Sequence, residues 1–105
     1  DEDNPKLYLI AATHLMHIPK ALGGSKAKAE SYLKRSLKLN DKNPDNDSLM
    51  LKWAEDAEIY AYFAQLEILR ENAEKAEKYM QKALKLAPDY GYVKYDLKPQ
   101  LENLK

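Results

Sequence analysis

One internal repeat constrains the fold of this chain more than any other feature of its sequence. The segment 24–39 (GSKAKAESYLKRSLKL) returns 47 residues later as the segment 71–86 (ENAEKAEKYMQKALKL), and seven of the sixteen aligned positions are identical. Most of the other aligned positions keep their residue class. Such repetition is typical of helical repeat proteins, in which each unit buries its apolar face against the next. We therefore expect a repeated helical architecture.

Length and composition indicate one modest globular domain. The chain has 105 residues, 17 basic and 17 acidic side chains, 45% hydrophobic residues and no cysteine. This composition is ordinary for a soluble protein and offers neither a disulfide framework nor a thiolate metal site. No apolar run reaches the roughly 18 residues of a membrane span. Because Asp1 stands where an initiator Met would be, we expect a processed precursor, a trimmed chain or a fragment, and the compartment stays open.

Proline and capping residues mark the ends of the first helices. Pro5 suits the first turn of a helix that should run to about His17, because Pro19 disfavours helical backbone at the residue before it. Ser25 can cap a second helix that ends near Asn40. The polar segment 40–48 (NDKNPDNDS) is rich in turn residues and separates this helix from the next one.

Three further helices are expected in the second half. The segment 48–70 contains neither proline nor glycine and is apolar around most of its circumference, so we place this long helix at the centre of the domain. Asn72 can cap a fourth helix that Ala87-Pro88 stops. Asp89 can cap a fifth, which Pro99 should break or restart. Because no alternating apolar run is long enough for a strand, the predicted fold class is all-α.

The segment 57–88 resembles one tetratricopeptide repeat, a helix-turn-helix unit of about 34 residues. Its first signature group is matched by Tyr60-x2-Phe63-Ala64, its second by Ala76-x3-Met80, and its last by Ala83 and Pro88. Small residues at the alanine positions let helix backbones approach closely. The sequence departs from the family at Glu67, where a tyrosine is usual.

An earlier, looser copy precedes it. Its first helix aligns as Tyr8-x2-Ala11-Ala12-x2-Leu15 and its second as Ala29-x3-Leu33 with Ser36, while Asp41 stands where proline is usual. The resemblance implies a right-handed superhelix of about five antiparallel helices in a single domain, 1–105. Repeat one should cover about 5–41, repeat two about 48–88, and a capping helix about 89–104.

The resemblance also implies a function and a site. In tetratricopeptide repeats the first helix of each pair lines a concave groove, which would be lined here by Glu58, Ala61, Tyr62, Gln65, Ile68 and Leu69. We therefore expect a non-catalytic scaffold that binds a peptide or helix of another protein in a partly acidic groove, with no cofactor and no metal. A partner with basic and apolar side chains suits this groove. The groove lacks the cations with which chaperone-binding members of the family hold a C-terminal carboxylate.

Charge and aromatic residues sharpen that expectation. The segment 45–74 carries two basic and eight acidic residues, so the middle of the chain is acidic. Four tyrosines lie outside the expected repeat core and are candidates for exposed recognition, although core filling is an equal reading for the first of them. These are Tyr62, Tyr90, Tyr92 and Tyr95.

Several alternatives remain. About three stacked repeats are usually needed for stability, so the chain could self-associate as a homo-oligomer or form a segment of a larger helical assembly. The hypothesis of a small metal-dependent enzyme would depend on His14 and His17 alone, whereas a catalytic zinc site requires at least three protein ligands. The lysine-rich stretches 34–42 and 78–85 are better explained as solvated helix faces than as a nucleic-acid site, because the net charge is zero.

Overall fold

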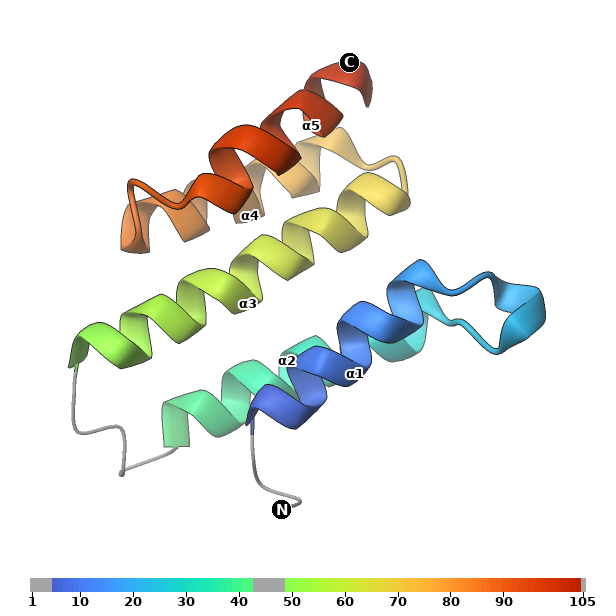
Figure 1. Cartoon of the computed structure of the whole chain (residues 1–105), viewed down its shortest axis with the longest axis horizontal. Coiled ribbons are helices and arrows are strands. Elements are labelled where there is room, and N and C mark those ends of the chain that lie inside the picture. The colour runs from blue at the N-terminus through green and yellow to red at the C-terminus, as the bar shows by residue number, and fades with distance from the viewer. Residues whose placement is uncertain (1–4, 43–48, 105) are drawn as a thin grey trace.

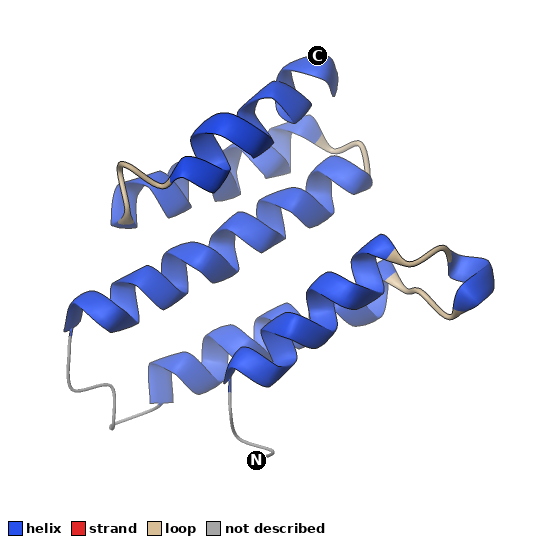
Figure 2. Ribbon diagram, in the orientation of Figure 1, coloured by secondary structure: helices blue, strands red, loops and turns tan. Residues whose placement is uncertain are grey.

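The chain folds into helices throughout the part that the computed structural model describes, residues 5–42 and 49–104, with side chains for residues 6–39 and 56–104. Within these residues there is no strand, which confirms the all-α prediction (Figure 2). Over the described ranges, five α-helices are accompanied by a short 3-10 helix and a π-helical turn. In chain order they are α1 (Pro5–His17), η1 (Lys20–Leu22, 3-10), α2 (Lys26–Lys42), α3 (Leu49–Leu69), α4 (Ala73–Leu86), η2 (Tyr92–Leu97, π) and α5 (Lys98–Leu104).

The helices form two layers (Figure 1). Helices α1, α3 and α5 lie nearer the viewer, with α2 and α4 behind them, and the molecule measures 40 × 33 × 17 Å. Helix α3 contacts α1, α2, α4, η2 and α5, whereas α1 and α5 lie at opposite edges. The central place predicted for the long helix is therefore confirmed.

Two core clusters meet on α3. One joins α3 to the N-terminal pair of helices, and its buried members are Leu9, Ala12, Met16, Ala29, Leu33, Ile59, Phe63 and Leu66. The other joins α3 to the C-terminal helices, and its buried members are Ala61, Ala64, Ile68, Ala76, Met80, Ala83, Val93, Leu97 and Leu101. A helix that is apolar over most of its circumference is stable only when it is covered on several sides, and here both sides are covered.

Small residues occupy equivalent places in the two helix pairs. Ala12, Ala29 and Ser36 of the first pair correspond in the sequence alignment to Ala64, Ala76 and Ala83 of the second, and all six are at most 1% exposed. A larger side chain at any of these positions would push two helix backbones apart.

Aromatic and cationic side chains repeat in the same way. Tyr8 of α1 packs edge-on against Tyr32 of α2 with ring centroids 5.7 Å apart, and the Arg35 guanidinium lies 5.9 Å from the Tyr8 centroid. In the second pair, Tyr60 stacks on Tyr79 at 6.4 Å, and the Lys82 ammonium lies 5.5 Å from both ring centroids. The internal repeat of the sequence thus corresponds to a repeated arrangement of two tyrosines and one cation.

The turn between α1 and α2 is tightly built. Gly23 has φ of +97°, and Gly24 is so close to α1 that a Cβ there would lie 1.8 Å from the Ile18 carbonyl oxygen. The Ser25 hydroxyl accepts from the Lys28 backbone N–H at 3.0 Å, which caps α2 as the sequence predicts.

A left-handed residue ends α3. The N–H of Glu71 donates to the Ile68 carbonyl and that of Asn72 to the Glu67 carbonyl, the bond pair that closes many helices at their C-terminus. Glu71 has φ of +61°, a conformation that glycine adopts at less cost. The Asn72 side chain then accepts from the Lys75 N–H and caps α4, as predicted.

The C-terminal helix differs from the prediction in two respects. No side chain caps it, and Asp89 instead lies 3.5 Å from the Lys94 ammonium. Pro99 does not break the helix, because η2 precedes it and the Lys98 N–H reaches back to the Val93 carbonyl. A proline lacks the N–H and crowds the carbonyl four residues before it, and a wider π turn allows the chain to stay helical there.

Candidate functional site

The six groove residues predicted on α3 divide into two groups. Ala61, Gln65 and Ile68 are at most 7% exposed, and the two apolar members belong to a core cluster with residues of α4, η2 and α5. Glu58, Tyr62 and Leu69 are only half-buried. Helix α4 and the C-terminal segment therefore pack on the part of α3 that carries these three residues, whereas the other three stay partly accessible.

Hydrogen bonds attach the C-terminal helix to this face. The Tyr92 hydroxyl donates to Gln65 Oε1 at 3.0 Å, and Gln65 Nε2 donates to Gln100 Oε1 at 3.2 Å. Gln100 in turn donates to the Asp96 carbonyl at 3.0 Å. A buried amide needs both donor and acceptor partners, and Gln65 finds one of each on the covering helix.

The accessible part of the α3 face opens into a pocket near Glu58. This pocket has a volume of about 500 Å³ and is lined by Glu58, Ala87, Pro88, Asp89 and Tyr90. Helix α3 supplies the glutamate, and the loop after α4 supplies the other residues, because α4 returns antiparallel to α3 and ends beside it. The Tyr90 N–H donates to the Ala87 carbonyl at 3.1 Å, which closes the loop into a turn around Pro88.

Three tyrosines form one side of this region. The Tyr62 and Tyr92 ring centroids lie 5.4 Å apart, and those of Tyr90 and Tyr92 lie 6.3 Å apart. We call Glu58, Tyr62, Asp89, Tyr90 and Tyr92 the acidic-aromatic site. Tyr95, the fourth tyrosine that the sequence offered for recognition, is 77% exposed on the same π turn.

Burial raises the pKa of all three tyrosines, and the Glu58 carboxylate adds to this shift at Tyr62 and Tyr90. Burial first, and then the charge of Glu58, raises the pKa of Tyr62. The same two causes, with a contribution from Tyr62, raise the pKa of Tyr90 to about 12. Burial also raises the pKa of Tyr92. At neutral pH the site presents carboxylates beside phenol rings, a combination that suits a cation with an apolar stem.

The sequence did not predict two features of this region, namely the place of Asp89 at the pocket and the hydrogen bond between Gln100 and Gln65. Asp89 was expected to cap a helix, and Gln100 was not singled out at all. The antiparallel return of α4 places the loop 87–90 beside Glu58, a relation between residues about thirty positions apart that periodicity does not encode.

The two histidines lie elsewhere. His14 and His17 are both exposed on α1. Among the side chains that the structure describes, those of residues 6–39 and 56–104, no three His, Asp or Glu come together in a way that could hold a metal ion. Across residues 5–42 and 49–104, every helix is too short or too polar to cross a lipid bilayer.

No match to this chain was found among models of known protein families, curated protein sequences or solved structures.

Proposed function

We propose that this chain is a non-catalytic helical scaffold that binds a basic and apolar segment of another protein at the acidic-aromatic site. The observation that carries the proposal is the half-buried Glu58 carboxylate beside the tyrosine cluster, in an open pocket of about 500 Å³. A lysine or arginine of a partner could pair with Glu58 and Asp89 while its stem packs on Tyr90.

We also infer that the two helix pairs are tetratricopeptide-like units of a right-handed superhelix. The six buried small residues and the two tyrosine–tyrosine–cation clusters support this inference, since they fall at equivalent positions of the two copies. Replacing Ala29 or Ala76 with leucine should each lower the free energy of unfolding by about 1–3 kcal/mol. Ala27→Leu, on the exposed face of α2, is the control and should have little effect. A tolerated leucine at both buried positions would contradict the inference.

Fluorescence anisotropy with two labelled peptides tests the binding proposal. One peptide carries arginine and leucine side chains, and the other has glutamate in place of arginine. We expect the basic peptide to bind and Glu58→Lys to weaken it about tenfold. The control is Glu102→Lys, the same charge reversal at an exposed position of α5. Equal effects of the two reversals, or no binding of the basic peptide, would contradict the proposal.

Exposed apolar side chains on α1 favour a second candidate function, self-association. Leu7 and Ile10 are 49% and 63% exposed and lie about one turn apart on α1, the helix at one edge of the molecule (Figure 1). The equivalent edge of the second pair is covered by the first pair, as expected for a stack of repeats. The uncovered edge would then receive another copy of the chain.

Analytical ultracentrifugation at high micromolar concentration distinguishes this candidate. Association of the wild-type chain that Ile10→Lys abolishes would support it, provided that Leu22→Lys has no effect. Leu22 is the matched control because it is 76% exposed on η1, away from the α1 edge. A monomeric wild-type chain would exclude the candidate.

A further inference from the structure

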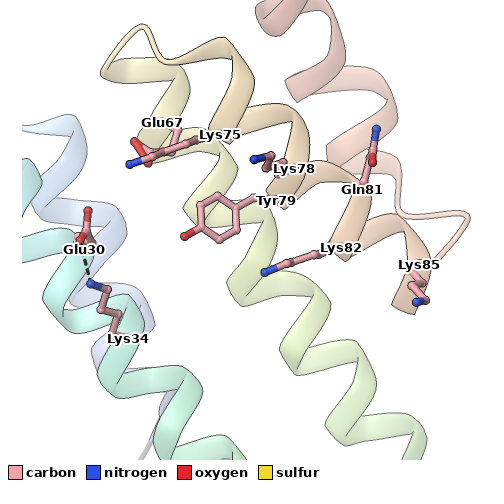
Figure 3. Close-up of a pocket in the computed structure, with 9 residues that line it drawn as sticks. All are labelled: Glu30, Lys34, Glu67, Lys75, Lys78, Tyr79, Gln81, Lys82 and Lys85. Atoms are coloured by element: carbon pink, nitrogen blue, oxygen red, sulfur yellow. Dashed lines mark ion pairs between the residues drawn. The ribbon is translucent and has the colours of Figure 1, made fainter.

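A second concave surface lies on the opposite layer of the molecule, between α2 and α4. Both helices pack on α3, and over the described part of the chain no Cα atom of α2 lies within 8 Å of one of α4. The cleft between them has a volume of about 640 Å³ (Figure 3). Its lining residues are Glu30 and Lys34 of α2, Glu67 of α3, and Lys75, Lys78, Tyr79, Gln81, Lys82 and Lys85 of α4.

The floor of the cleft is aromatic. Tyr79 is half-buried and stacks on Phe63 with ring centroids 4.9 Å apart. Figure 3 shows the Tyr79 ring and the Lys82 chain directed from α4 across the cleft toward α2. Lys82 lies 5.5 Å from the centroids of Tyr60 and Tyr79, so its ammonium is held over two rings. A cation that is already positioned loses less conformational entropy when a ligand binds.

The lysines of α4 form a row along one face. Lys75, Lys78, Lys82 and Lys85 follow one another at steps of three, four and three residues, which places them on the same side of a helix. With a rise of 1.5 Å per residue, the row spans about 15 Å. All four side chains belong to exposed residues.

The carboxylates of the cleft do not neutralise this row. Glu30 binds Arg70 and lies 3.0 Å from the Lys34 ammonium, and Glu67 lies 3.6 Å from the Arg70 guanidinium. The hydrogen bonds from Arg70 and Lys34 lower the pKa of Glu30. Both carboxylates are thus paired with cations at the α2–α3 side, and the α4 side keeps a surplus of positive charge.

We propose that the cleft between α2 and α4 is a second docking surface, which binds an acidic segment of a partner protein. Carboxylates spaced three or four residues apart on a partner helix would match the lysine row, and apolar side chains between them would pack on Tyr79. Glu74 lies 3.8 Å from Lys78, and Glu30 and Glu67 stand at the cleft wall. The row is only about 15 Å long and carries the Glu74 charge beside it, so it suits a few discrete carboxylates better than a continuous phosphate backbone, whose affinity grows with many successive cations.

The test uses two triple variants that remove the same charge. Lys75→Gln/Lys82→Gln/Lys85→Gln alters the cleft, and Lys20→Gln/Lys26→Gln/Lys98→Gln alters exposed lysines outside it. The probes are a labelled peptide of glutamate and leucine and a single-stranded RNA of equal charge, at about 0.15 M salt. We expect the cleft variant to bind the peptide about tenfold more weakly and the control variant to change affinity less than about twofold.

Three results would overturn the proposal. They are equal weakening by the two triple variants, no peptide binding to the wild-type chain, and tighter binding of the RNA than of the peptide. If the cleft variant does not fold, acetylation footprinting of lysines in the wild-type chain tests where the peptide binds. The bound peptide should protect the α4 lysines more than Lys20, Lys26 and Lys98, and uniform protection would refute the proposal. The acidic-aromatic site is probed by the basic peptide, so the two proposals fail separately.

Discussion

The Tyr92 hydroxyl donates to the amide oxygen of Gln65 at 3.0 Å, which joins the C-terminal helix to the α3 face where the sequence predicts a groove. Gln65 is only 4% exposed, and Gln100 accepts from its Nε2. The chain therefore covers part of its own predicted groove, and the open part is displaced toward Glu58 and the loop after α4.

Removing the Tyr92 hydroxyl should destabilise the protein. Tyr92→Phe leaves the buried Gln65 oxygen without its phenol donor, which should lower the free energy of unfolding by about 1–2 kcal/mol. Urea denaturation provides the measurement. Tyr95→Phe is the matched control, because Tyr95 is 77% exposed on the same π turn and should change stability by less than about 0.5 kcal/mol. Equal losses would show that the Gln65 contact does not stabilise the fold.

Two glycines should respond to alanine in opposite directions. Gly24→Ala places a Cβ 1.8 Å from the Ile18 carbonyl oxygen, so the turn must shift at a cost of about 2 kcal/mol or more. Gly91→Ala meets only the flexible Tyr95 ring at 3.6 Å, and its helical φ of −62° suits alanine. Thermal denaturation should show that the free energy of unfolding rises by about 0.5–1 kcal/mol in Gly91→Ala. A stable Gly24→Ala protein would refute the tight turn.

Glu71→Gly should stabilise the chain. Glu71 ends α3 with φ of +61°, and glycine adopts this conformation without the clash of a Cβ. We expect the free energy of unfolding to rise by about 0.5–1 kcal/mol in chemical denaturation. Glu74→Gly, in the first turn of α4, should instead lower it by about as much. Destabilisation by both changes would argue against the left-handed end of α3.

The Glu30–Arg70 contact should make the free energy of unfolding depend on pH. The hydrogen bond from Arg70, and then that from Lys34, lowers the pKa of Glu30 below its ordinary value of 4.5. Because the folded pKa is the lower one, this stabilisation is complete above pH 4.5 and is lost as the pH falls through the folded pKa. Glu30→Gln should cost about 1 kcal/mol at neutral pH and less at low pH.

Denaturation at neutral and acidic pH measures that effect. Glu74→Gln is its control, because the Glu74 side chain is 84% exposed and lies 3.8 Å from the Lys78 ammonium. It should change stability little at either pH. A Glu30→Gln penalty that does not shrink in acid would contradict the assigned pKa shift.

Local residue chemistry explains how much of the fold was predictable. Pro5, Pro19, Ser25 and Asn72 act on the backbone within a few residues, so the helix ends they predict agree closely with the structure. The central place of α3 followed from apolar residues around its circumference. The π turn before Pro99 was not predicted, because a proline signals a helix break and the local sequence does not show that a wider turn bridges it.

The site was less predictable because it depends on long-range packing. Periodicity indicated which face of α3 is apolar, but not that the segment 92–101 would pack against α3 and form hydrogen bonds with Gln65. The same limit applies to the lysines of α4. Their spacing predicts one solvated face, whereas the cleft below them exists only because α3 holds α2 and α4 apart.

The most direct test of the proposed scaffold is an NMR titration of the isotope-labelled wild-type chain with the arginine-leucine peptide. Backbone amide shifts report each binding surface without any substitution. We predict that the largest changes cluster at Glu58, Tyr62 and residues 87–92, with little change along α4 between Lys75 and Lys85. Changes spread evenly over the molecule, or no changes near Glu58, would contradict the proposed binding site.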